Sequence, residues 1–270
     1  MESELVLFAG GAVVGVLGAL LGLGGGVLIV PLLTLGFGES LSRAIGTSLV
    51  AVVATSAGAA VHNVRTGRAD VRLGLTLEIG TVLGAAAGGL LAGLLADRVL
   101  AGLFAGLMAY LALSLLRQSV APRDDSDVAE AVDPAAPDGP GAPAYRARRL
   151  PLALGGSVGA GAVSALLGVG GGIVKVPVMR LLMGVPMHVA TATSNFMIGV
   201  TAAAGAYGYL FRGDIEPMVA APLALGVLSG AAVGARVAPR VHTRWLTILF
   251  VVVAGWVAVE MGLRAAGVAR

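Results

Sequence analysis

The stretch Leu21–Pro31 reads LGLGGGVLIVP, and 146 positions later Leu167–Pro177 reads LGVGGGIVKVP. Seven of the eleven positions are identical, and each copy places three consecutive glycines before a short apolar segment that ends in proline. Adjacent glycines disfavour continuous helix and tolerate left-handed backbone. We therefore expect each triplet to break a helix, and the chain to be a duplicated half.

Further matches at the same offset extend the repeat over both halves. The matched positions are Thr47-Ser48 with Thr193-Ser194, Asp70 with Glu216, and Gly80, Gly84 and Gly88 with Gly226, Gly230 and Gly234. Small residues four apart line one helix face and let helices approach closely in a membrane. We interpret these glycine stripes as packing faces, and a homodimer face is an extension of that interpretation.

The composition is that of a membrane protein. Of 270 residues, 57% are hydrophobic and 12% are charged, and the mean hydropathy is +0.92. A soluble core of this length could not bury so much apolar surface, so we expect an all-α integral membrane protein in the lipid bilayer. Apolar runs of about the ~20 residues that cross a bilayer lie near 5–23, 45–64, 75–96, 100–116, 150–169, 188–210, 217–238 and 245–263.

These runs predict about eight transmembrane helices in two tandem four-helix repeats, residues 1–116 and 150–270, each with a broken helix at its glycine triplet. Residues 117–149 are rich in proline and charge and are expected to form a flexible cytoplasmic linker. Whether the two repeats are parallel or inverted depends on the short apolar pieces 27–37 and 173–183. Taken as half-helices they give four crossings per half and parallel repeats, whereas counted as crossings they give five and inverted repeats.

Charge does not decide between these arrangements. With Lys175 and Arg180 set aside because they lie inside apolar stretches, both place eleven arginines on the linker side and five on the other side. Each short piece has eleven residues, about 16 Å of helix against a hydrocarbon core of about 30 Å. Length therefore favours four crossings per half.

Several functional classes are excluded by what the sequence lacks. There is no cysteine, which removes disulfides, thiolate nucleophiles and iron–sulfur ligation. The three histidines have no metal-ligand spacing, and the chain has no HExxH motif. The arginines stand at the edges of apolar runs and form no basic face for nucleic acid. We expect no enzyme activity, cofactor, metal or nucleic-acid partner.

Candidate site residues gather around the two triplets. The amides that open each short helix carry the positive end of a helix dipole, so one end from each half could converge on an anion held between the repeats. Hydroxyl and amide groups near the start of the next span could bind oxyanion oxygens, although helix capping is the alternative. The predicted substrate-binding residues are Gly24, Gly25, Gly26, Thr47, Ser48, Gly170, Gly171, Gly172, Lys175, Thr193, Ser194 and Asn195.

Charged residues inside apolar segments are costly in a membrane and are functional candidates by default. Lys175 is the only lysine of the chain, and it lies just past the second triplet. It could bind an anion or lose a proton in a coupled cycle, and the alternative is that it snorkels to the interface. Glu78, inside the third span, is the proton-coupling candidate, with an interfacial position as the alternative. Thr191 and Thr201 rank below the paired motifs.

Together these motifs resemble one known family. The triplet with its proline, the segment Ala44–Ser48 (AIGTS) and the loop Gly67–Asp70 (GRAD), all with counterparts in the second half, are similar to the TauE/SafE family of sulfite exporters, also called TSUP permeases. The resemblance implies a transporter of duplicated four-span units that moves sulfite, sulfoacetate or other organosulfonates, with proton coupling.

Under that resemblance we expect export across the inner (plasma) membrane of a prokaryote. A permease for another small solute or cation, and a membrane scaffold that transports nothing, are the alternatives.

Overall fold

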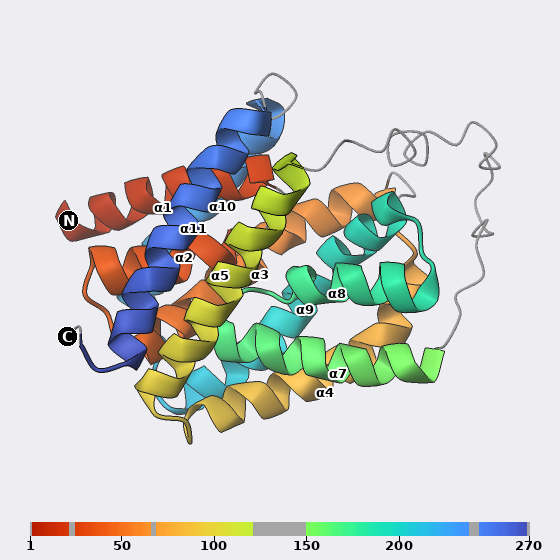
Figure 1. Ribbon diagram of the computed structural model, residues 1–270, viewed down its shortest axis with the longest axis horizontal. Coiled ribbons are helices and arrows are strands. Elements are labelled where there is room, and N and C mark those ends of the chain that lie inside the picture. Colours follow the sequence, from red (N-terminus) through yellow and green to blue (C-terminus); the bar gives the residue numbers. More distant parts are fainter. Residues whose placement is uncertain (1, 22–24, 66–68, 121–149, 238–242, 269–270) are drawn as a thin grey trace.

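The computed structural model describes residues 2–21, 25–65, 69–120, 150–237 and 243–268. Within them all regular structure is helical (Figure 1). The elements are α1 (Glu2–Leu21), α2 (Gly26–Pro31), the π-helical η1 (Leu32–Gly36), α3 (Leu41–Arg65), α4 (Val71–Ala92), α5 (Asp97–Val120), α7 (Leu150–Leu167), α8 (Gly172–Pro177), the π-helical η2 (Val178–Leu182), α9 (Met187–Phe211), α10 (Pro217–Val237) and α11 (Thr243–Ala265). Gly24 and residues 121–149 of the expected linker lie outside the described residues, and α5 continues into the linker's first four positions.

The two halves follow the repeat offset closely. α2 and α8, η1 and η2, and α3 and α9 begin and end 146 residues apart. Gly25 and Gly171, which directly precede α2 and α8, both have a φ of 79°, a left-handed value that glycine adopts without strain. Pro31 and Pro177 have no N–H to continue the α-helical bonding, and at each the chain changes from α-helix to π-helix.

The halves interlock through the glycine stripes. α1 packs against α10, and the equivalent pair α7 and α4 packs in the same way. A Cβ at Gly84 would lie 1.9 Å from the carbonyl oxygen of Val158, and one at Gly230 would lie 2.0 Å from that of Ala12. The packing role predicted for these stripes is therefore confirmed. Because both stripes are covered within one chain, they no longer support the homodimer face that we linked to them.

Contact register shows the direction of these helices. Gly226, Gly230 and Gly234 face Phe8, Ala12 and Val16 in ascending order, so α1 and α10 are parallel. The same ascending order holds for α4 against α7, whereas in the contacts of α3 with α9 Gly46 meets Tyr209 and Ser56 meets Gly199, which makes that pair antiparallel.

The second half is inverted relative to the first. In Figure 1, α1 and α7 begin at opposite ends of the molecule, and both termini lie at the end where α1 begins. The parallel repeats favoured by length are therefore wrong. The physical reason is that Gly26–Gly36 brings the chain back toward the end where α1 starts, so it counts as a return pass despite its shortness.

The outer surface is apolar. Among the described residues, five helices are long and apolar enough to cross a membrane: Val71–Ala92, Asp97–Arg117, Leu150–Leu167, Pro217–Gly234 and Ile248–Ala265. Large apolar side chains stand exposed at helical spacing, such as Leu75, Ile79 and Leu83 on α4. A surface of this kind fits lipid rather than water.

Candidate functional site

An ion pair is buried where three helices meet. Lys175 on α8 and Glu78 on α4 have side chains that are 2% and 8% exposed, and Nζ lies 3.5 Å from Oε2. Thr201 on α9 joins them, because Lys175 donates a hydrogen bond to its Oγ1 and that hydroxyl donates to Glu78 Oε1 at 2.6 Å. Buried charges are tolerated only when paired in this way. We call Glu78, Lys175 and Thr201 the charged centre.

The helix break positions Lys175. α8 begins directly after Gly171, and the backbone N–H of Lys175 donates to the carbonyl oxygen of Gly171 at 3.0 Å. The side chain therefore leaves the first turn of a helix that starts inside the protein.

The start of α4 is fixed to α9, and this brings Glu78 to the same place. Asp70 caps α4 by accepting from the backbone N–H of Leu73 at 2.9 Å, and Asp70's own N–H donates to Thr193 Oγ1 at 2.9 Å. Thr193, predicted as a substrate ligand, is an anchor between the halves in this structure. Glu78 follows about two turns into α4.

The first half has no equivalent of the charged centre. At the repeat offset its three positions correspond to Ile29, Thr55 and Ala224, and Thr55 Oγ1 bonds to carbonyl oxygens of its own helix, Ala51 at 3.2 Å and Val52 at 3.1 Å. The two breaks do meet, because a Cβ at Gly26 would lie 2.7 Å from the carbonyl oxygen of Gly168. Of the two helix starts predicted to converge on an anion, only the second carries a lysine, as the sequence itself shows.

Two equivalent serines also differ. Ser48 Oγ donates to the carbonyl oxygen of Gly168 at 2.7 Å and lies 3.2 Å from that of Gly26, so it ties the two breaks together. Its counterpart Ser194 is 1% exposed, and its hydroxyl has no hydrogen-bond partner in the described part of the chain. A Cβ at Gly172 would lie 3.5 Å from that hydroxyl. Ser194 therefore places an unpaired, buried hydroxyl beside the break.

Ser164 on α7 is a second buried hydroxyl without a hydrogen-bond partner among the described residues. Its Oγ would lie 3.2 Å from a Cβ at Gly171. The sequence analysis did not single it out, because its repeat counterpart is Gly18 and a lone serine in an apolar helix is usually structural. The two hydroxyls flank the second break from α7 and α9.

The remaining predicted residues occupy different places. Thr47 is buried on α3, Asn195 is half-buried on α9, and Gly25 precedes α2 in the left-handed conformation. Thr201 was ranked too low. The signal that could have raised it is its alignment with Thr55, and its position seven residues after Ser194, two turns along the same helix face.

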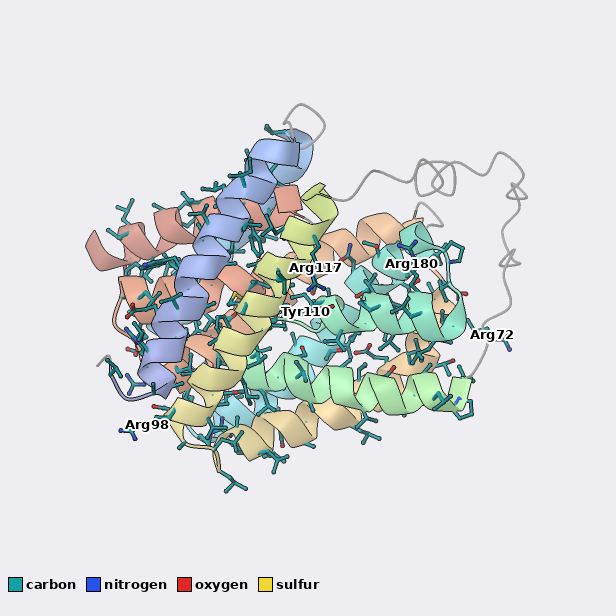
Figure 2. All side chains as sticks on the ribbon, in the orientation of Figure 1. Arg72, Arg98, Tyr110, Arg117 and Arg180 are labelled. Atoms are coloured by element: carbon teal, nitrogen blue, oxygen red, sulfur yellow. The ribbon has the colours of Figure 1, made fainter. Side chains whose placement is uncertain are left out.

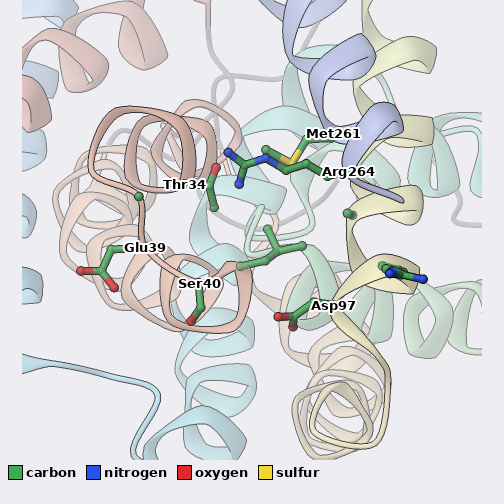
Figure 3. Close-up of a pocket in the computed structure, with 10 residues that line it drawn as sticks. Thr34, Glu39, Ser40, Asp97, Met261 and Arg264 are labelled. Atoms are coloured by element: carbon green, nitrogen blue, oxygen red, sulfur yellow. The ribbon is translucent and has the colours of Figure 1, made fainter. Parts of the chain in front are cut away.

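A separate cavity of about 260 Å³ opens at the end of the molecule where the termini lie (Figure 3). It is lined by residues of both signs, among them Glu39, Asp97, Arg98 and Arg264. None of the predicted site residues lines it. Among the described residues, no cluster of His, Asp or Glu could hold a metal ion.

Comparison with known proteins places the chain. The model of the family described as "Sulfite exporter TauE/SafE" matches residues 7–261. The chain belongs to the sulfite exporter TauE/SafE family. This TauE/SafE protein is 28% identical over 260 residues to the "Probable membrane transporter protein YunE" of Bacillus subtilis, covering 93% of this chain and 94% of the relative. It is 24% identical over 258 residues to the "Probable membrane transporter protein MJ0441" of Methanocaldococcus jannaschii, covering 88% of each.

No solved structure matches this TauE/SafE protein significantly. The family and both relatives agree on a coarse class. The chain is a multi-pass membrane transporter, and its family gives no indication of enzyme activity.

Proposed function

We propose that this membrane transporter is a secondary carrier that exports sulfur-containing anions, such as sulfite, sulfoacetate or other organosulfonates. The proposal of an anionic substrate rests on one observation. The only lysine of the chain is buried in the first turn after a helix break, beside two hydroxyls that have no hydrogen-bond partner among the described residues. The sulfur chemistry is supported by the family description. The inner membrane of a prokaryote is supported by its bacterial and archaeal relatives.

The substrate is held between the two repeats at the second break. Ammonium, hydroxyl and backbone N–H groups are the donors that oxyanion oxygens accept from most strongly. Lys175 supplies the charge, Ser194 and Ser164 supply hydroxyls, and Gly170–Gly172 supply backbone amides. On the side of the first half, Gly25 and Gly26 with Thr47 and Ser48 close the site.

The topology that fits this site has eight long helices in the membrane: α1, α3, α4 and α5 in the first repeat and α7, α9, α10 and α11 in the second. Each repeat adds one broken segment, α2 with η1 or α8 with η2. The repeats comprise residues 1–116 and 150–270. Arg72 and Arg180 lie at one end of the molecule and Arg98 at the other (Figure 2). By the excess of arginines we assign the end with Arg72 and the linker to the cytoplasm.

Currents from purified protein in liposomes on a solid-supported membrane test the function. Sulfite, sulfoacetate, isethionate, sulfate, acetate, sodium and a neutral amino acid are applied in turn. Saturable transport of the sulfur oxyanions is expected, as a current or as isotope counterflow, and Lys175→Gln is expected to lower it about tenfold or more because the buried cation is lost. Arg180→Gln is the matched control, since it removes an exposed cation from the adjoining η2.

Electroneutral exchange gives no current, so isotope counterflow is run on the same liposomes. Transport confined to a cation or to the neutral solute contradicts the anion assignment. Silence in both assays supports a scaffold without transport.

A further inference from the structure

The two carboxylate oxygens of Glu78 are used differently. Oε1 accepts from Thr201 at 2.6 Å, whereas Oε2 has no hydrogen-bond partner in the described part of the chain and lies 3.5 Å from Lys175 Nζ. A charge-assisted N–H···O bond is shorter, about 2.7–2.9 Å. Thr201 therefore holds Glu78 in place, and one buried oxygen remains able to accept a proton.

The charged centre has a net charge of zero, with one ammonium and one carboxylate. Surroundings that exclude water strongly disfavour an uncompensated charge. An anion that bound Lys175 beside an ionised Glu78 would make the centre negative and would bring two anions close together, where they repel. The centre becomes neutral again when Glu78 takes up one proton as the anion binds.

We propose that Glu78 and the substrate compete for Lys175, so that a monovalent sulfur oxyanion crosses together with one proton in the same direction. This inference rests on the anion transport proposed above. The proton from water binds Glu78 Oε2, which gives a neutral carboxyl, and the Lys175 ammonium keeps its three protons and pairs with the anion. When the anion leaves, the proton leaves Oε2 and the ion pair forms again.

Other ionisable groups near the centre are few. α7, which packs against α4, contains none. The remaining ones on the helices around the centre are Arg72 on α4, His188, Tyr207 and Tyr209 on α9, and Arg180 on η2. Arg72 and Arg180 lie at the end of the molecule (Figure 2), and the Tyr209 hydroxyl donates to the carbonyl oxygen of Ala165 at 3.0 Å. Of the ionisable groups on these helices, Glu78 and Lys175 are the two that pair with each other.

This competition selects substrates by charge. One ammonium with one added proton balances one negative charge, so hydrogen sulfite and alkylsulfonates fit the centre, whereas sulfate leaves a charge uncompensated. Sulfoacetate, which has a sulfonate and a carboxylate, fits only when its carboxylate is protonated. Net export is then driven by accumulation of the anion in the cytoplasm, and an alkaline exterior assists it.

The test uses full-length protein in liposomes with a pH-sensitive dye inside, equal pH on both sides and the membrane potential clamped. The probe is an inward gradient of isethionate, a sulfonate that keeps a single charge around neutral pH. The lumen is expected to acidify as isethionate enters, and an equal gradient of sulfate is expected to give little uptake. Glu78→Gln is expected to lose the acidification and to exchange isethionate at a rate that no longer depends on pH. Glu260→Gln is the control, because Glu260 pairs with Arg264 at a half-exposed position on α11.

Isethionate entry without acidification, or with alkalinisation, overturns the coupling and leaves anion transport standing. Uptake of sulfate equal to that of isethionate overturns the selection by charge. If neither isethionate nor sulfite moves in the exchange assay, the transport function itself is contradicted, and this inference with it. Should Glu78→Gln fail to fold, the sign of the wild-type pH change still decides the question.

Discussion

Ser48 Oγ lies 2.7 Å from the carbonyl oxygen of Gly168. A hydroxyl of the first half therefore donates a hydrogen bond to a backbone carbonyl beside the helix break of the second half. The pair explains why two serines at equivalent positions have different roles. In the second half Ser194 has no such partner within the described residues. Ser48 therefore ties the two breaks together, and we propose that Ser194 binds the substrate.

Replacing each serine by alanine separates these roles. Ser48→Ala is expected to lower the free energy of unfolding by about 1–2 kcal/mol, because a buried carbonyl oxygen loses its donor. Ser194→Ala is expected to leave the melting temperature nearly unchanged and to weaken sulfite transport. Melting curves in detergent and counterflow in liposomes measure the two effects. Equal destabilisation by both substitutions would contradict the claim that only Ser48 has a structural role.

The glycine stripe on α4 predicts a second contrast. Gly84→Ala places a methyl group 1.9 Å from the Val158 carbonyl oxygen, so α4 and α7 must separate, and we expect a loss of about 2 kcal/mol or more. Gly106→Ala on α5 is the matched control, since a Cβ there meets nothing within 4 Å. It is expected to be neutral or to stabilise by up to about 1 kcal/mol. Thermal stability in detergent is the measurement, and a Gly84→Ala protein as stable as wild type would contradict the packing.

The cap on α4 gives a third prediction. Asp70→Ala removes the acceptor of the Leu73 N–H and is expected to cost about 1 kcal/mol, whereas Asp70→Asn keeps an acceptor and costs less. Glu216→Ala, at the equivalent position, removes only a half-exposed contact with Arg43 at 4.0 Å and is expected to change stability by less than about 1 kcal/mol. Chemical denaturation compares the three variants. A loss in Glu216→Ala as large as in Asp70→Ala would contradict the capping role.

The inverted arrangement can be tested because the chain has no cysteine. Arg72 and Met218 lie 146 positions apart, and both side chains are exposed. In intact cells, a membrane-impermeant maleimide is expected to label Met218→Cys and to leave Arg72→Cys unlabelled until the membrane is opened. Labelling of both cysteines from the same side would indicate parallel repeats.

The helix breaks and the packing stripes were predictable from the sequence, because the same residues recur at the repeat offset of 146 positions. The breaks at the triplets and the packing stripes follow from where glycine and proline recur, and α2 and α8 begin 146 residues apart as that recurrence predicts. Direction was not predictable, since it depends on whether an eleven-residue segment such as Gly26–Gly36 returns the chain, and neither its length nor the arginine count determines that.

The charged centre shows the same limit. Lys175 and Glu78 could each be singled out as charges in apolar segments, but they lie on α8 and α4, from different halves. Their contact depends on how the halves interlock. The sequence signal for Thr201 was weak, because threonines in membrane helices usually bond to their own backbone, as Thr55 does. Thr201 Oγ1 also lies 3.2 Å from the carbonyl oxygen of Met197 on its own helix, and its bond to Glu78 depends on how the halves pack.

Counterflow of radiolabelled sulfite in liposomes, with wild type, Lys175→Gln and Lys175→Arg compared at equal amounts of folded protein, tests the central claim most directly. We predict saturable exchange by the wild type and a loss of about tenfold or more in Lys175→Gln, the effect of losing a charged hydrogen-bond donor worth about 1.5–3 kcal/mol. Lys175→Arg is expected to retain part of the exchange because it keeps the charge. Sulfite exchange at the wild-type rate in Lys175→Gln would contradict an anion site at the second helix break.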